Sequence, residues 1–258
     1  MKQEIVCIKL GGSVITDKKI PYHAKVDVIK NIAKSLKKIN APLVISHGSG
    51  SFGHTSAAKY CKKHGYTSKW GIAKVAFDAM TINNIVTEIF ISEKLPAVSF
   101  RPMSHITAEK GKIKNSFFEP ILLALEQGLI PVVYGDIIWD LEWKSTVFSG
   151  ETTLNALGIY LQKKGYLVKK IIELCNVDGV LDSQGKVIPH INKPLWNEIK
   201  SSVGASADTD VTGGMRHKIE AALDLAKSGI STHIINGNSS GVLIDAINKK
   251  SVGTTISI

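Results

Sequence analysis

The sequence has few cysteines and no long apolar run. Its three cysteines, Cys7, Cys61 and Cys175, lie far apart, and no two of them form a CxxC pair. A disulfide framework or a cysteine-based zinc site is therefore not expected, and reduced thiols in a cytoplasmic protein fit the pattern better. No run reaches about 18 apolar residues, so we expect no membrane-spanning helix, and the first residues do not resemble a signal peptide.

Arginine is almost absent, although the chain is strongly basic. The formal net charge is +10, yet only Arg101 and Arg216 among the 32 basic residues are arginines. Arginine supplies most planar, bidentate contacts to bases and phosphates in nucleic-acid complexes. We therefore expect a solvated, lysine-rich surface that attracts small anions, and no nucleic-acid partner. Binding of nucleic acid by the basic surface is the alternative, and a salt-dependent electrophoretic shift would reveal it.

Short β-branched runs alternate with helical patterns along the chain. Strands are predicted at residues 4–10, 43–46, 97–100, 130–134, 169–174, 233–236 and 254–258, with a hairpin within 137–148. Helices are predicted at residues 24–39, 51–63, 72–95, 119–127, 152–164, 215–227 and 242–249. The alternation predicts a single α/β domain with an open, mainly parallel sheet and helices on both faces. Ligands of such sheets bind beyond the carboxyl ends of the strands.

Three glycine-containing loops lie where such a ligand is expected. Residues 11–13 (GGS) follow the first strand, and residues 47–54 (HGSGSFGH) follow the second. Gly213 and Gly214 precede the helix that carries Lys218. Glycines let backbone N–H groups approach an anion, and a helix N-terminus behind them adds partial positive charge. Glycine also occurs at such turns for steric reasons alone, and neither of the first two loops is a P-loop, but the three together predict a phosphate site.

These motifs resemble the amino acid kinase superfamily over essentially the whole chain. The segments KLGGSVITDK, HGSGSFGH, YGD, FSGE, NVDGVL and DVTGGMRHK occur in the family's order, and the match is best with the isopentenyl phosphate kinases. The resemblance implies an open αβα sandwich, a homodimer, and ATP with Mg²⁺ as cofactors. It implies that residues 1–165 form an acceptor-binding lobe and residues 166–258 a nucleotide-binding lobe. The implied reaction converts isopentenyl phosphate, an isoprenoid monophosphate, to isopentenyl diphosphate.

The resemblance also implies roles for individual residues. The expected catalytic residues are Lys9, Lys18, His54 and Lys218. The expected nucleotide contacts are Lys9, Gly11, Gly12, Ser13, Ser49, Asp178, Gly213 and Lys218. The expected contacts to the acceptor's phosphate are Gly48, Gly53, His54 and Gly150. No protein ligand is assigned to the metal ion. Ser49 stands where the family usually has glycine, and Glu151 and Asn176 stand where it usually has aspartate.

The residue chemistry fits transfer to a phosphate acceptor. Such an acceptor is already anionic, so the main tasks are positioning and charge neutralisation, for which three lysines are available. His54 offers a directed N–H donor, and a neighbouring phosphate dianion favours its imidazolium form. Phe77 and Met80, on the long helix at 72–95, are assigned to the apolar tail of the acceptor. Ordinary core packing is the competing interpretation of these two residues.

Two other functions remain open at this stage. The first is a kinase of the same superfamily with a polar acceptor, such as fosfomycin or an amino acid. The second is a catalytically silent nucleotide-binding regulator. Loss of the key lysines would favour the regulator, but Lys9, Lys18 and Lys218 are all present.

Overall fold

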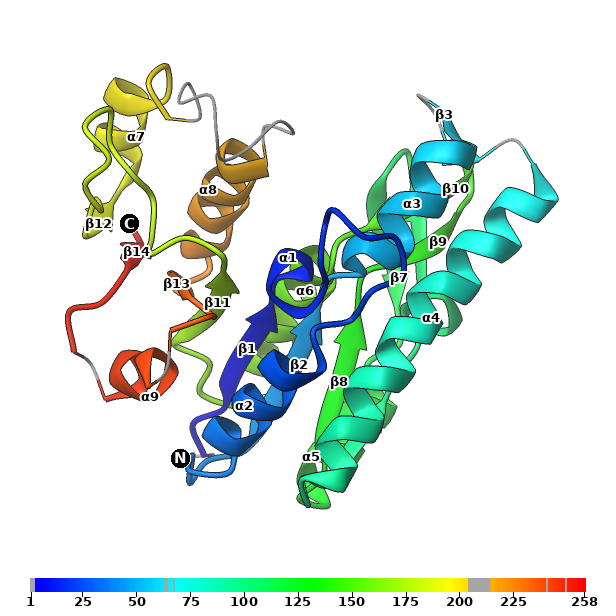
Figure 1. The fold of residues 1–258 in the computed structure, drawn as a ribbon, viewed down its shortest axis with the longest axis horizontal. Coiled ribbons are helices and arrows are strands. Elements are labelled where there is room, and N and C mark those ends of the chain that lie inside the picture. Colours follow the sequence, from blue (N-terminus) through cyan, green and yellow to red (C-terminus); the bar gives the residue numbers. More distant parts are fainter. Residues whose placement is uncertain (1–2, 63–64, 67, 204–213, 240, 249) are drawn as a thin grey trace.

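A computed structural model describes residues 3–258 except 63–64, 67, 204–213, 240 and 249 (Figure 1). The main sheet contains the strands Val6–Leu10 (β1), Leu43–His47 (β2), Ala97–Ser99 (β5), Ile130–Tyr134 (β8), Lys170–Cys175 (β11), His190–Ile191 (β12), Ser231–Asn236 (β13) and Thr254–Ile256 (β14). Their order is β12-β14-β13-β11-β1-β2-β8-β5. The strands from β13 to β5 run parallel to one another, whereas β14 runs antiparallel to β13.

Helices cover both faces of this sheet and produce an αβα sandwich. One face carries Val26–Leu36 (α2), Lys69–Ser92 (α4) and Val242–Ile247 (α9). The other face carries Glu119–Glu126 (α5), Gly150–Lys163 (α6) and Gly214–Ala226 (α8). The fold class predicted from the sequence is thus confirmed, with helices on both sides of a mainly parallel sheet.

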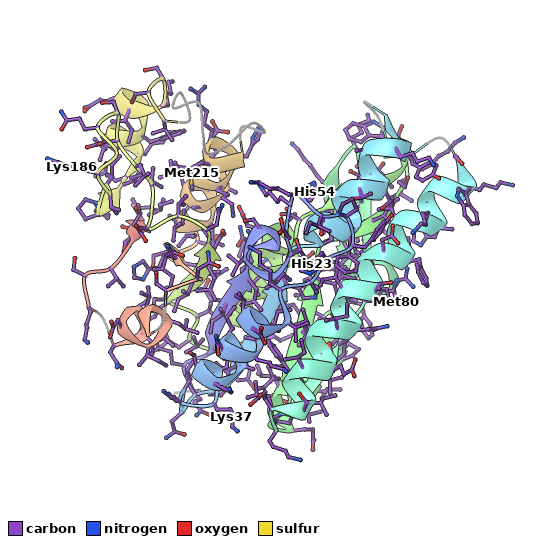
Figure 2. All side chains as sticks on the ribbon, viewed as in Figure 1. His23, Lys37, His54, Met80, Lys186 and Met215 are labelled. Carbon is purple, nitrogen blue, oxygen red and sulfur yellow. The ribbon has the colours of Figure 1, made fainter. Side chains whose placement is uncertain are left out.

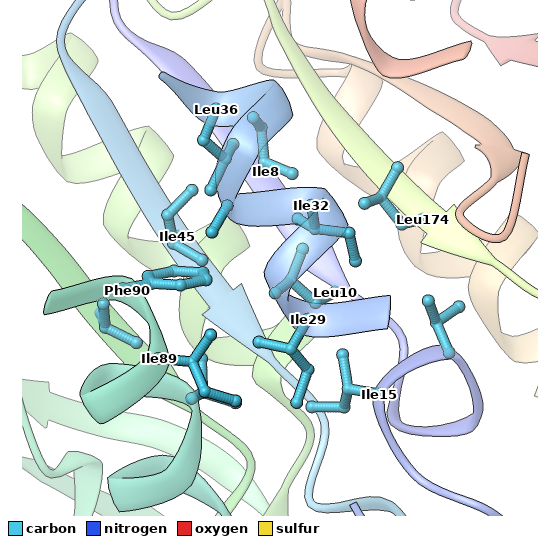
Figure 3. Packing of buried hydrophobic residues seen from close by; sticks show 14 of the residues in the cluster. Ile8, Leu10, Ile15, Ile29, Ile32, Leu36, Ile45, Ile89, Phe90 and Leu174 are labelled. Atoms are coloured by element: carbon cyan, nitrogen blue, oxygen red, sulfur yellow. The ribbon is translucent and has the colours of Figure 1, made fainter. Parts of the chain in front are cut away.

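Alternation along the strands decides which side chains reach which layer. Ile8 and Leu10 of β1 pack with α2 and α4 (Figure 3), whereas Cys7 packs with α5 and α6. Successive side chains of a strand point to opposite faces. Lys9 therefore lies on the α6 face, and Glu173, its register partner on β11, lies on the same face.

The α2 helix shows why the apolar spacing predicted this arrangement. Ile29, Ile32 and Leu36 recur at helical intervals and are almost completely buried. They contact Ile45 of β2 and Phe90 of α4 within one continuous cluster (Figure 3). Residues three, four and seven apart share one face of a helix, so the pattern forms an apolar stripe that packs on the sheet.

Helix starts near the site use capping side chains. Ser149 accepts a hydrogen bond from the backbone N–H of Thr152 at the start of α6, and Ser68 accepts one from Gly71 at the start of α4. Such caps satisfy N–H groups that the first helical turn leaves without partners. No described helix is long and apolar enough to cross a membrane.

Smaller elements complete the described chain. They are Gly12–Ile15 (α1), Gly50–Tyr60 (α3), Lys193–Ile199 (α7), the 3-10 turn Pro102–Ser104 (η1), and the strands Cys61–Lys62 (β3), Gly65–Tyr66 (β4), Ile106–Glu109 (β6), Lys112–Ser116 (β7), Asp136–Asp140 (β9) and Lys144–Phe148 (β10). A second sheet has the order β10-β9-β6-β7, and β9 and β10 form the hairpin that the sequence predicted.

Every predicted strand and helix corresponds to an observed one, with ends that differ by a few residues. The sequence analysis missed α1, α7, η1, β3, β4, β6, β7 and β12. These elements are short, and β7 is mostly exposed. A single turn or a short solvated strand has too few apolar residues to show a period.

Candidate active site

A cavity of about 450 Å³ lies beyond the carboxyl ends of the central parallel strands. Its described lining comes from the loops after β1, β2, β8, β10 and β11, and from α3, α4 and α8. In Figure 1 these loops meet at one edge of the sheet, between α3 on one side and α8 on the other. This is the edge at which a ligand of an open α/β sheet is expected.

Most of the predicted site residues line this one cavity. They are Lys9, Gly11, Gly12, Ser13, Lys18, Gly48, Ser49, Gly53, His54, Gly150 and Lys218. The cavity therefore brings together residues that lie more than 200 positions apart in the sequence, from β1 to α8.

Three predicted residues are not among the described residues that line the cavity, and a fourth cannot be compared. The carboxylate of Asp178 accepts a hydrogen bond from Asn236 at 2.8 Å, and Asp178 is not among the described residues that line the cavity, whereas its neighbours Val177 and Gly179 are. Phe77 and Met80 are likewise not among the described lining residues. Gly213 lies outside the described residues.

The cavity meets a different face of α4 from the one that carries Phe77, one of the two residues assigned to the acceptor's tail. Val75 and Ala79 of α4 line the cavity instead. Phe77 is 56% exposed, because two residues correspond to about 200° of rotation around a helix. In Figure 2, His54 lies on α3, whereas Met80 lies on the neighbouring helix α4. The competing interpretation assigns Phe77 to the hydrophobic core, and its exposure excludes that role.

Two glycine loops pack backbone against backbone beneath the cavity. A Cβ atom on Gly12 would lie 2.7 Å from the backbone nitrogen of Gly50, and one on Gly48 would lie 2.9 Å from the backbone nitrogen of Gly12. Gly50 also has a φ of +49°, which side chains disfavour. These glycines are therefore required for loop contact, and the same contact leaves the backbone accessible from the cavity.

Thr16 ties the two loops together. Its hydroxyl donates to the carbonyl of Gly12 at 2.7 Å and accepts from the backbone N–H of Ser51 at 2.9 Å. Thr16 is fully buried. One side chain thus fixes the start of α3 relative to the loop after β1, and the sequence analysis did not assign it a role.

Four charged side chains converge beside the loops, each from a different element. Lys9 Nζ lies 3.2 Å from Oε2 of both Glu151 and Glu173. Lys218 Nζ lies 2.7 Å from the same oxygen of Glu173 and 3.4 Å from that of Glu151. The two ammonium groups and two carboxylates form a closed, formally neutral ring, which we call the charge cluster.

Burial and mutual charge set the ionisation of this cluster. Burial opposes the ionisation of Glu173, but Lys218 and Lys9 outweigh it and lower its pKa to about 2. Burial and the adjacent Glu173 raise the pKa of Glu151. Burial alone would lower the pKa of Lys218, but Glu173 and the other neighbouring anions raise it well above its ordinary value. Lys218 is therefore held as a cation beside the cavity.

The other end of the cavity is mostly apolar. Ala57, Val75, Ala79, Val147 and Phe148 line the cavity, and Ala57 packs against the buried cluster that contains Val75. Ala57 follows His54 by three positions on α3, and such residues share a helix face. A histidine thus sits directly beside a wall of small apolar side chains.

His54 and Lys18 are exposed residues that both line the cavity. Burial and the charge of Lys18 lower the pKa of His54. The ligand-free site therefore favours neutral imidazole, and only an added anion would favour the imidazolium form.

His47, from the same sequence motif, has a structural position. It is fully buried, its ring stacks on Tyr134, and its two ring nitrogens lie 3.1 Å from the carbonyl of Gly48 and 3.2 Å from Asn83 Oδ1.

Asp136 is a further lining residue that the sequence analysis did not assign. Its carboxylate accepts from the backbone N–H of Ile137 at 2.8 Å, and Oδ2 lies 3.5 Å from Arg101 Nε. Burial raises its pKa to about 6, although Arg101 opposes the rise.

Within the described part of the chain, no group of three or more His, Cys, Asp or Glu residues is arranged to hold a metal ion. Asp136, which lines the cavity, has Arg101 as its partner, and Glu151 and Glu173, behind the lining, pair with lysines. These residues offer no preformed metal cage. Mg²⁺ is usually held by substrate phosphates, waters and one or two carboxylates, so a magnesium ion here would depend on bound phosphates.

Comparison with known proteins identifies the family. The amino acid kinase family model matches residues 4–236. The chain is 33% identical over 248 residues to isopentenyl phosphate kinase of Methanothermobacter thermautotrophicus, covering 90% of this chain and 91% of that protein. It is 30% identical to isopentenyl phosphate kinase of Methanocaldococcus jannaschii over 98% of both chains.

A solved structure described as isopentenyl phosphate kinase superposes with a TM-score of 0.83 at 28% identity, covering 98% of this chain and all of that one. Acetylglutamate kinase of Campylobacter fetus is a more distant relative, at 24% identity over 99% of this chain and 92% of its own length. The chain therefore belongs to the amino acid kinase family, and within it to the isopentenyl phosphate kinases.

Proposed function

We propose that this protein transfers the γ-phosphoryl group of ATP to isopentenyl phosphate, giving ADP and isopentenyl diphosphate. One observation carries the proposal: a single cavity joins glycine loops and lysines to a wall of small apolar side chains beside His54. The first part suits phosphates, and the second suits a short hydrocarbon tail. The relatives named isopentenyl phosphate kinase support the same assignment.

We assign the two substrates to opposite ends of the cavity. The acceptor's phosphate binds at Gly48, Gly53, His54 and Gly150, with its tail against Ala57, Val75 and Ala79. The nucleotide binds toward the lobe at residues 166–258, with its phosphates near Ser13, Gly214 and Lys218. All of these residues line the cavity, and the division follows the two predicted lobes.

Positioning and charge neutralisation account for the chemistry. ATP supplies the phosphoryl group, and an oxygen of the acceptor's phosphate displaces ADP from it. Lys9 and Lys218 neutralise charge where donor and acceptor meet, and Lys18 approaches from the loop after α1. His54 donates an N–H to the acceptor's phosphate. Bound Mg²⁺ would neutralise further phosphate charge. No strong general base is required, because the acceptor oxygen is already anionic.

A kinase with a polar acceptor is the second candidate. Acetylglutamate kinases are among the relatives, and fosfomycin has its own phosphonate group. The apolar lining disfavours an amino-acid acceptor, since a carboxylate placed there would lose its hydration without compensation. Fosfomycin has only a small methyl-substituted epoxide beside its phosphonate, so the acceptor assay must separate it from isopentenyl phosphate. A catalytically silent regulator is disfavoured because Lys9, Lys18 and Lys218 are retained and all line the cavity.

An acceptor screen tests the proposal. Purified protein would receive ATP and Mg²⁺ with isopentenyl phosphate, dimethylallyl phosphate, fosfomycin, glutamate, N-acetylglutamate, carbamate or UMP, and ADP release would be measured. We expect the two isoprenoid phosphates to give the highest kcat/KM. A higher kcat/KM for fosfomycin or N-acetylglutamate would identify that compound as the acceptor instead. If no compound leads to ADP release, a regulator would be favoured.

Three further properties are proposed, the first from the family resemblance, the second from the cysteine pattern and the third from the scarcity of arginine. We propose that the protein forms a homodimer, resides in the cytoplasm and does not bind nucleic acid. Light scattering after size exclusion would give the mass of the assembly. Electrophoretic mobility of DNA and RNA at several salt concentrations tests the last point, because counterion release makes nucleic-acid binding strongly salt-dependent.

A further inference from the structure

Glu173 occupies an unusual position for a carboxylate. It is 2% exposed and lies on β11, a central strand with neighbours on both sides. Its strand neighbours Ile171, Ile172 and Leu174 are buried and apolar. A buried carboxylate is costly unless it is paired and hydrogen-bonded. Its pairing with Lys9 and Lys218 offsets that cost, and a role confined to stability would not require two cavity-lining lysines as partners.

The charge cluster has a definite orientation toward the cavity. Lys9 and Lys218 are among the described residues that line it, whereas Glu151 and Glu173 are not. The lysine side chains are 8% and 23% exposed, and that of Glu173 is 3% exposed. The carboxylates thus lie behind the ammonium groups, on the side away from the substrates.

The hydrogen bonds of Lys9 and Lys218 leave one N–H of each ammonium group available to a phosphate. Each ammonium has three N–H donors, and within the described part of the chain two of them point to Glu151 and Glu173. One donor of each lysine therefore remains for a ligand. Because a single oxygen of Glu173 accepts from both lysines, it fixes the distance between the two cations.

We propose that Glu173 is a positioning residue for phosphoryl transfer: its Oε2 atom holds Lys9 and Lys218 side by side, with one N–H of each directed to the transferring group. This inference rests on the proposed function only for the identity of the acceptor. Glu173 holds Lys218 more closely than Glu151 does, at 2.7 Å against 3.4 Å. Loss of its charge therefore releases Lys218 first.

Glu173→Gln tests this role, since it keeps the shape and one acceptor oxygen but removes the charge. We expect kcat to fall on the order of 10²-fold, as for a misplacement of about 1 Å in an active site, with smaller changes in both KM values. The groups facing Lys218 are Glu173 and Cys175 of β11, Glu151 of α6 and Lys9 of β1. With one anion fewer, Lys218 should lose its proton at lower pH than in the wild-type protein, so kcat should gain an alkaline limb at lower pH.

Two further variants separate positioning from stability. Glu173→Asp retains the charge, so it should recover part of kcat and lack the new alkaline limb. Glu119→Gln is the matched control, because Glu119 accepts from Tyr160 and pairs with Lys164 away from the cavity lining. It should retain the wild-type kcat and pH profile. Circular dichroism and thermal unfolding would accompany each variant.

A second readout does not depend on the acceptor. Acylation of Lys218 by acetic anhydride, followed by mass spectrometry across pH, reports its protonation in the resting protein. We expect the midpoint to move to lower pH in Glu173→Gln and to stay in Glu173→Asp. An unchanged midpoint, or a kcat within about threefold of wild type, would overturn the proposal. Absence of turnover in the wild-type protein would count against the proposed function, while the acylation result would still decide the role of Glu173.

Discussion

The two ends of the cavity differ in how they are built. At the end where we propose that the nucleotide binds, charges from β1, α6, β11 and α8 hold one another in a closed cluster. At the end proposed for the acceptor, His54 and Lys18 are exposed, and apolar residues also line the cavity. The charge cluster is pre-organised to bind phosphate, so substitutions there should abolish most activity. The apolar lining selects the acceptor by shape, so substitutions there should keep activity but change which acceptor is preferred.

Replacing one lysine from each end gives the largest contrast. Lys218→Ala and Lys18→Ala should each lower kcat on the order of 10²–10³-fold, by analogy with the loss of other transition-state donors. Their stabilities should differ, because Lys218 belongs to the buried cluster and its loss leaves two carboxylates to share Lys9, with one negative charge uncompensated, at a cost of about 3–5 kcal/mol. Lys18 is exposed, so its loss should change stability by at most about 0.5 kcal/mol. Steady-state kinetics and urea unfolding measure both effects.

Equal destabilisation by the two lysine variants would contradict the distinction between a buried cluster and an exposed loop. Near-normal turnover in a folded Lys218→Ala would remove that residue from the site.

Removing the imidazole of His54 probes the acceptor end alone. His54→Ala should lower kcat/KM for isopentenyl phosphate by at least about tenfold, because a hydrogen bond to a charged group contributes roughly 1.5–3 kcal/mol. His54→Gln should retain part of the activity through its amide N–H. The KM for ATP should stay near the wild-type value. A weaker ATP affinity with an unchanged acceptor KM would mean that the assignment of the two ends is reversed.

Changing the size of the apolar wall should alter which tail is accepted. Val75→Ala adds space and should raise the relative kcat/KM for geranyl phosphate, whereas Ala79→Leu should reduce activity with isopentenyl phosphate. One methylene in an apolar pocket changes discrimination by roughly 10–200-fold. Phe77→Ala is the control, because Phe77 is exposed and is not among the described lining residues. If Phe77→Ala is the one variant that shifts the chain-length preference, the tail contacts Phe77 rather than Val75 and Ala79.

The smallest expected effect concerns Asp136 and pH. Its pKa is raised from 3.8 to about 6 by burial, so the folded state binds a proton more tightly than the unfolded state. Its contribution to stability is therefore greatest below about pH 4 and falls as pH rises to 6, by at most about 3 kcal/mol. Urea unfolding from pH 4 to 7 should show a flatter profile for Asp136→Asn. An identical slope in both proteins would contradict the burial of this carboxyl group.

The sequence predicted the layers and most of the cavity because both depend on local patterns. Apolar periodicity placed α2 and the parallel strands, and glycines at strand ends indicated the phosphate loops. Glu173 was missed because its partners, Lys9 and Lys218, are distant in sequence and meet only through strand register and helix packing. One signal was available: a lone carboxylate within an apolar strand that is buried on both faces.

The assignment of the tail to Phe77 and Met80 depends on a choice that the sequence leaves open. Spacing along α4 shows which residues share a face, but not which face meets the cavity. The packing of α3 on α4 settles that choice by directing Val75 and Ala79 inward and leaving Phe77 in solvent. Thr16 was also missed, since its two hydrogen bonds depend on contact between loops that are far apart in sequence.

Phosphorus NMR of a competition reaction tests the central claim most directly. The protein would receive ATP and Mg²⁺ with equimolar isopentenyl phosphate and fosfomycin, and each product would be followed by its own resonances. The account predicts that the paired resonances of isopentenyl diphosphate appear with ADP while fosfomycin remains largely unmodified. Preferential phosphorylation of fosfomycin, or ADP without any isopentenyl diphosphate, would contradict it.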